Sequence, residues 1–213
     1  MHPDPYKFLV ASGQVAGTEG GRSQPPHIRL WNHHTLETMT IIDHGFERQI
    51  VSLAFSRVDG GKVLYAIDDH TDHILSVWDW EKGGDDKPEK VGETKTTKET
   101  VLGMLANPIG ASEVVIYGKG HVIFLTLHKE KRVTKKSGIF GSIEKPKIVT
   151  CAQFTSNGDL LTGDSNGTVI GWKHGSNHSS FCITNVHQGK LIVLLYQHNL
   201  RHHECRTRVH HSN

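Results

Sequence analysis

Short apolar stretches separated by polar turns recur along most of the chain. They come in neighbouring pairs, at residues 50–55 and 63–67, 101–105 and 114–117, and 148–154 and 160–162. The turns that separate the short stretches include Asp-Gly, Gly-Lys-Gly and Asn-Gly, which favour antiparallel hairpins. No long segment shows a helical period. The pattern therefore predicts an all-β chain of short antiparallel strands.

The tryptophans reveal a repeat. Trp31 lies 47 residues before Trp78, and Trp78 lies 94 residues, or two such periods, before Trp172. Each follows an aliphatic stretch. The missing copy falls at Leu125, inside the strand-like segment 122–126. The chain thus holds four units of about 47 residues, and such periods are typical of propellers and other repeat folds.

One unit corresponds to a four-stranded antiparallel blade, and Trp78-Asp79 is the dipeptide that names WD repeats. A single blade cannot bury both of its apolar faces, whereas blades stacked radially cover one another. We therefore predict a partial WD-repeat β-propeller of about four blades. Its inter-blade core is marked by Trp31, Trp78, Leu125 and Trp172.

The repeat also predicts the blade boundaries. One propeller region spans residues 1–197, with blades at about 1–43, 44–95, 96–140 and 141–186 and the start of a further blade at 187–197. Residues 8–13 look like the second strand of a blade, and residues 191–196 look like the first strand of another. We therefore expect a propeller truncated at both ends. Residues 198–213 lack strand periodicity and are expected to be disordered.

Composition adds that the chain is an ordinary globular one, with 36% hydrophobic and 22% charged residues. Its three cysteines, Cys151, Cys182 and Cys205, are odd in number and contain no CxxC pair, so a reducing compartment is expected. The first residues do not form a secretion signal, and the longest apolar run, 191–196, is too short to span a bilayer. We expect a cytoplasmic protein without a membrane partner.

Several phrases between the tryptophans resemble the echinoderm microtubule-associated protein-like (EML) family. They lie at residues 11–17, 45–48, 67–69, 77–80, 138–141, 144–147 and 158–165, and the resemblance runs from about residue 2 to 196. It implies a cytoplasmic, cytoskeletal protein that associates with microtubules or tubulin through a tandem propeller. The coiled coil and hydrophobic motif of the family are not in this sequence, and its third-blade tryptophans are Leu125 and Leu127 here.

The first functional hypothesis is a non-enzymatic scaffold that binds microtubules or tubulin, and the alternative is a general WD-repeat adaptor for another protein complex. No nucleophile motif, HExxH motif or phosphate-binding loop occurs. A zinc site at His70 and His73, beside Asp68, Asp69 and Asp72, is a third hypothesis. However, the i, i+3 spacing of the histidines suits a helix, and they lie in a turn. We therefore expect no catalytic residue, metal, cofactor or nucleic acid partner.

The most basic segment is 129–147, with seven Lys and Arg residues against Glu130 and Glu144. If its side chains gather on one rim, they form a positive patch that attracts an acidic partner. The plainer interpretation is a solvated, Lys-rich outer strand that resists edge pairing. Arg48 is a second candidate contact, unless it pairs with Glu47 or with a carboxylate of a neighbouring blade and so fixes the strand entry. The candidate partner-binding residues are Arg48, Lys129, Lys131, Arg132, Lys135 and Lys136.

Overall fold

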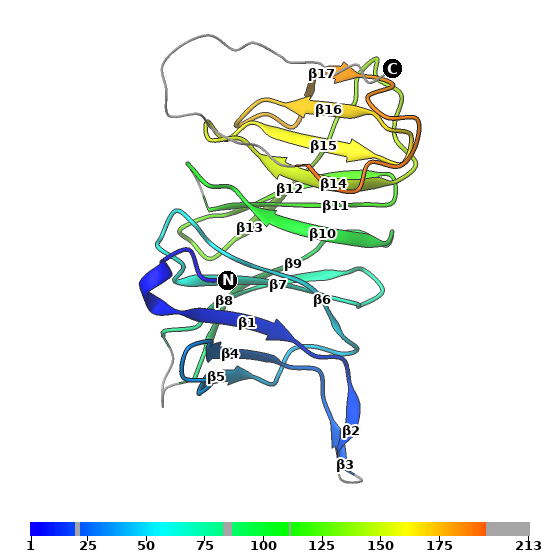
Figure 1. The fold of residues 1–213 in the computed structure, drawn as a ribbon. Coiled ribbons are helices and arrows are strands. Elements are labelled where there is room, and N and C mark those ends of the chain that lie inside the picture. Colours follow the sequence, from blue (N-terminus) through cyan, green and yellow to red (C-terminus); the bar gives the residue numbers. More distant parts are fainter. Residues whose placement is uncertain (20–21, 83–86, 111, 195–213) are drawn as a thin grey trace.

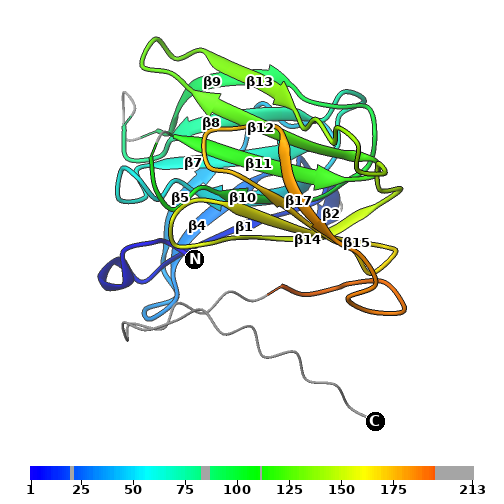
Figure 2. The same ribbon diagram turned by 90° about the horizontal axis from the view of Figure 1, so that it is seen from above.

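The computed structural model describes residues 1–19, 22–82, 87–110 and 112–194 of the 213-residue chain. Across these residues the chain is nearly all β, as predicted, and its one helix, η1 (Pro5–Lys7), is a single 3-10 turn. No helix in these ranges is long and apolar enough to cross a membrane. Figure 1 shows the sheets stacked in chain order, and Figure 2 looks down that stack.

Four antiparallel sheets make up the stack. Blade 1 contains β1 (Leu9–Gly13), β4 (Ile28–Asn32) and β5 (Thr38–Ile42). Blade 2 contains β6 (Ile50–Phe55), β7 (Val63–Asp68), β8 (Ile74–Asp79) and β9 (Glu89–Lys95). Blade 3 contains β10 (Val101–Ala106), β11 (Glu113–Gly118), β12 (His121–Leu127) and β13 (Val133–Ser137). Blade 4 contains β14 (Val149–Phe154), β15 (Leu160–Asp164), β16 (Val169–Trp172) and β17 (Ser179–Ile183).

The core lies between the blades. One apolar cluster joins blades 1 and 2 and contains Trp78. A second joins blades 2 and 3 and contains Leu125, and a third joins blades 3 and 4 and contains Trp172. Each of these three residues is at most 1% exposed and faces the preceding blade. Leu125 thus fills, with a smaller side chain, the place that tryptophan takes in the neighbouring units.

Trp31 does not follow this rule. Ile28 and Leu30 on the same strand face blade 2, so Trp31 faces the opposite side. No other blade of the described chain packs there, and Trp31 is only half-buried. The expectation that it belongs to an inter-blade core therefore needs correction: it occupies the repeat position, but its face is partly exposed.

The indole N–H groups find partners inside their own blades. Trp78 donates to Ser76 Oγ at 2.9 Å, and Trp172 donates to Thr162 Oγ1 at 3.0 Å. The Trp31 indole donates to Ser12 Oγ at 3.3 Å. These bonds let the two buried indoles enter the core without an unsatisfied donor, which would be costly there.

The linkers between blades supply a second aromatic ring to each buried tryptophan. Phe46, between β5 and β6, lies 5.8 Å from Trp78 between ring centroids, and Phe140, between β13 and β14, lies 5.2 Å from Trp172. Phe46 and Phe140 are 94 residues apart, the same separation as their two tryptophans. Gly138 makes room for this contact, because a Cβ there would lie 2.9 Å from the Trp172 ring.

Backbone irregularities repeat with the same period. The pairing of the first two strands shifts between residues 50 and 52, 101 and 103, and 149 and 151. A further shift between the third and fourth strands occurs at Trp31, Trp78 and Trp172. The corresponding pairing of β12 with β13, next to Leu125, is regular. The shifts are therefore part of the repeat and not isolated defects.

Two segments differ from the predicted pattern. Between β1 and β4 the chain forms an extra hairpin of β2 (Gly17–Glu19) and β3 (Arg22–Gln24), which projects from blade 1 in Figure 1. Residues 191–194, predicted to begin a further strand, are not in a strand; instead Leu191 packs against Cys151 and Val169 of blade 4. Residues 195–197 and the tail 198–213, predicted to be disordered, lie outside the described residues.

Trp78 is buried and Trp31 is partly exposed, so replacing each in turn tests how much burial contributes to stability. We expect Trp78→Ala to lower the free energy of unfolding by about 3–5 kcal/mol, because it opens a cavity between blades 1 and 2. Trp31→Ala should cost less than about 2 kcal/mol, since its ring is already partly hydrated. Urea unfolding followed by circular dichroism measures both. Equal losses would contradict the assignment of Trp31 to an uncovered face.

Candidate functional site

The basic segment 129–147 is divided by the fold into separate groups. The turn between β12 and β13, residues 128–132 and hereafter the basic turn, carries Lys129, Lys131 and Arg132. Lys135 and Lys136 follow on β13, while Lys145 and Lys147 lie beyond it in the linker to β14. All seven side chains are exposed. They do not gather into one patch, because the β13 strand separates the turn from the linker.

Two of these lysines fasten blade 3 to blade 2. Lys131 Nζ lies 2.5 Å from Glu89 Oε1 at the start of β9. Lys135 Nζ donates to the carbonyl oxygens of Lys95 at 3.1 Å and Thr96 at 3.0 Å. The hydrogen bond from Lys131 holds the pKa of the Glu89 carboxyl below its usual value. Part of the positive charge predicted for partner binding is therefore used within the molecule.

The three remaining cations of the basic turn and β13 are more available. Lys129, Arg132 and Lys136 form no ion pair with any residue that the structure describes. Lys136 lines a small hollow of about 180 Å³ between blades 3 and 4, together with Phe124 and His174. Lys129 and Arg132 remain on the basic turn.

Arg48 is exposed in the linker between blades 1 and 2. Its carbonyl oxygen accepts a hydrogen bond from the Ala16 N–H at 2.9 Å, which fixes the chain directly before β2. Glu47 lies 3.7 Å from His70 Nε2. Among the described residues no ion pair joins Glu47 to Arg48. The Arg48 side chain therefore stays a candidate contact, separate from the basic turn.

The residues considered as a zinc site, His70, His73 and the aspartates beside them, make hydrogen bonds within the protein. His70 Nδ1 accepts the Asp72 N–H at 3.1 Å, and His73 Nδ1 lies 3.0 Å from the Thr97 carbonyl oxygen. Asp68, which is buried, caps the turn by accepting two backbone N–H groups. No three His, Cys, Asp or Glu side chains in the described ranges are arranged to hold a metal ion.

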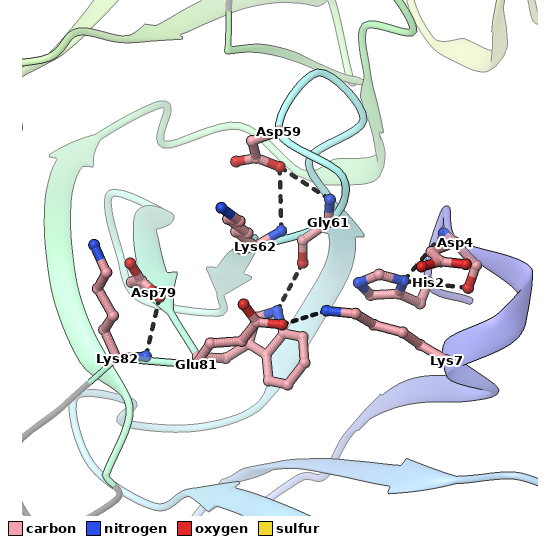
Figure 3. A network of polar contacts seen from close by, with 10 residues as sticks. His2, Asp4, Lys7, Asp59, Gly61, Lys62, Asp79, Glu81 and Lys82 are labelled. Carbon is pink, nitrogen blue, oxygen red and sulfur yellow. Dashed lines mark hydrogen bonds and ion pairs between the residues drawn. The ribbon is translucent and has the colours of Figure 1, made fainter.

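The end of blade 2 near the N-terminus is closed by the chain itself, as Figure 3 shows. Lys7 pairs with Glu81 and sits 5.4 Å above the Trp80 ring, whose indole N–H donates to the Gly61 carbonyl at 2.7 Å. The His2 ring packs edge-on against Trp80, at 5.9 Å between centroids. Sequence reasoning assigned Trp80 no role, because its partners are far away in the chain. This network anchors the N-terminal segment.

Comparison with known proteins identifies one family. The family described as "Echinoderm microtubule-associated protein first beta-propeller" matches residues 1–208. The human echinoderm microtubule-associated protein-like 1 is 41% identical over 196 residues, covering 91% of this chain and 23% of that protein. The 77 kDa echinoderm microtubule-associated protein of Strongylocentrotus purpuratus is 40% identical over 195 residues, covering 91% of this chain and 27% of that protein. The chain thus spans about a quarter of the length of these relatives.

Solved structures support the fold. The β-propeller domain of Myceliophteria thermophila Cps50 (Swd1) superposes with a TM-score of 0.65 at 17% identity, covering 89% of this chain and 56% of that one. Saccharomyces cerevisiae Sqt1 gives a TM-score of 0.67 at 15% identity, covering 90% of this chain and 50% of that one. At such low identities the likeness concerns the propeller fold alone.

The contact between blades 2 and 3 predicts a titration shift. In Lys131→Ala the pKa of the Glu89 carboxyl should rise toward its ordinary value, because the hydrogen bond and positive charge that favour its ionised form are removed. Carboxyl-carbon NMR during a pH titration reports this pKa. The carboxyl of Asp72, which pairs with Lys95 at 3.0 Å, serves as the internal control and should not move. An unchanged Glu89 would contradict the pairing.

Proposed function

This chain belongs to the echinoderm microtubule-associated protein family, and we propose on that basis that it is a non-enzymatic scaffold that binds microtubules or tubulin. Its place of action would be the cytoplasm and the cytoskeleton. The observation that carries the proposal is the family match over residues 1–208, together with about 40% identity to proteins named for microtubule association.

We assign the partner contact to the basic turn. Lys129 and Arg132 are exposed, form no ion pair among the described residues and lie on the turn that connects β12 to β13. Positive groups of this kind steer an acidic protein surface toward the binding face, and salt weakens them. Lys131 contributes less, because Glu89 already offsets its charge.

Microtubule co-sedimentation tests this assignment. We expect Lys129→Glu combined with Arg132→Glu to weaken binding by about fivefold, since losing two exposed charge contacts costs about 1 kcal/mol. Binding of the unaltered protein should also fall as the salt concentration rises.

The matched control is Lys145→Glu combined with Lys147→Glu, which changes the net charge equally at the other end of blade 3. It should leave sedimentation nearly unchanged. If both pairs weaken binding alike, net charge and not the basic turn is responsible. If the unaltered protein does not sediment with microtubules at all, the chain is a propeller adaptor for a different partner, and the proposed function is wrong.

A further inference from the structure

A second basic surface lies at the opposite end of blade 3 from the basic turn. Three connections meet there: the β11–β12 turn, the linker from β9 to β10 and the linker from β13 to β14. Lys119 makes an antiparallel bridge with Ile148, and its N–H donates to the Thr100 carbonyl at 2.9 Å. The three connections border an open hollow of about 550 Å³, lined by Glu99, Lys119, Gly120, Lys145, Lys147 and Ile148.

The charge of this hollow is positive. Three of its six lining residues are exposed lysines, and its single carboxylate, Glu99, is paired with Lys119 at 3.1 Å. Lys145 and Lys147 form no ion pair within the described part of the chain. Burial lowers the pKa of the neighbouring His121, so its ring is neutral at pH 7 and leaves the positive charge to the lysines.

Part of the lining of the hollow is apolar. Ile148, directly before β14, is 37% exposed, although it sits where two linkers converge. Gly120 has a φ of 65°, a conformation that favours glycine, and it places no side chain over the opening. The lysine stems add further apolar surface below their ammonium groups. The lining therefore combines an apolar side chain with three positive ones.

These features select among ligands. An extended acidic peptide presents carboxylates to the lysines and one apolar side chain to Ile148. A nucleic acid strand suits the hollow less well, because bases are held by stacking on aromatic or Arg planes, and the lining contains neither. The hollow and the basic turn lie at opposite ends of the seven-residue strand β12, which separates them by about 20 Å.

We propose that this hollow is a binding site for an acidic peptide segment of a protein partner, with carboxylates on Lys145 and Lys147 and an apolar side chain on Ile148. It goes beyond the proposed function, since it is a second site that does not require microtubule contact. The two sites allow one blade to bind two partners at once.

Fluorescence anisotropy with a labelled Glu-Glu-Leu-Glu-Glu peptide tests the proposal. Lys145→Glu combined with Lys147→Glu should weaken binding by at least about tenfold, because attraction becomes repulsion. Lys129→Glu combined with Arg132→Glu, of equal net charge, should leave the affinity unchanged. Thermal melts of both variants should match the unaltered protein, since all four side chains are exposed.

The apolar contact with Ile148 is tested separately. The unaltered protein should bind the leucine peptide more tightly than a peptide of five glutamates, and Ile148→Ser should abolish this preference. Equal weakening by both lysine pairs, or no preference for leucine, would overturn the site. Tighter binding of oligo-dT than of the peptide, lost in the Lys145/Lys147 variant, would assign the hollow to nucleic acid instead. Since microtubule sedimentation is measured separately, either proposal can fail without the other.

Discussion

The structure depends on one constraint: a four-stranded sheet with two apolar faces has to be covered on both sides. Trp78, Leu125 and Trp172 meet it by packing on the blade before them. Beside the first two, Val77 packs on blade 3 and Phe124 packs on blade 4. Each blade thus buries its neighbour's surface, and stability comes from interfaces more than from any single sheet. The 47-residue period in the sequence results from this requirement, because each blade places its packing residues at the same positions.

The tryptophan and the linker phenylalanine act as a unit. Where the third strand carries Trp78 or Trp172, the preceding linker provides Phe46 or Phe140, and the strand pairing shifts beside the indole. In blade 3, Leu125 replaces the indole, and the pairing of β12 with β13 is regular. The first residue of the preceding linker is the buried Thr96. The larger indole ring requires a wider pocket, and the shifted strand pairing and the linker phenylalanine both border that pocket. Residues 138–141, which carry part of the family resemblance, have this structural role.

The fold could be predicted from the sequence because apolar periodicity reports local strands, and the tryptophan spacing reports how they repeat. The exposure of Trp31 could not, since a repeat position does not say whether a neighbour covers it. The β2–β3 hairpin was missed because its residues are small or polar and show no alternation. The basic segment was continuous in sequence but was divided by β13, which put Lys145 and Lys147 beside Lys119 instead of Lys129. Contacts between distant residues, such as Lys7 with Glu81, leave no local pattern.

The linker phenylalanines also govern where the chain can change length. Phe46 follows the end of β5 by four residues, and Phe140 follows the end of β13 by three, because each ring must reach the next tryptophan. After the ring this constraint no longer applies: three residues separate Phe46 from β6, but eight separate Phe140 from β14. The longer stretch contains Lys145 and Lys147. The segment that follows the linker phenylalanine can therefore vary in length and carry new charged side chains without disturbing the packing of the ring.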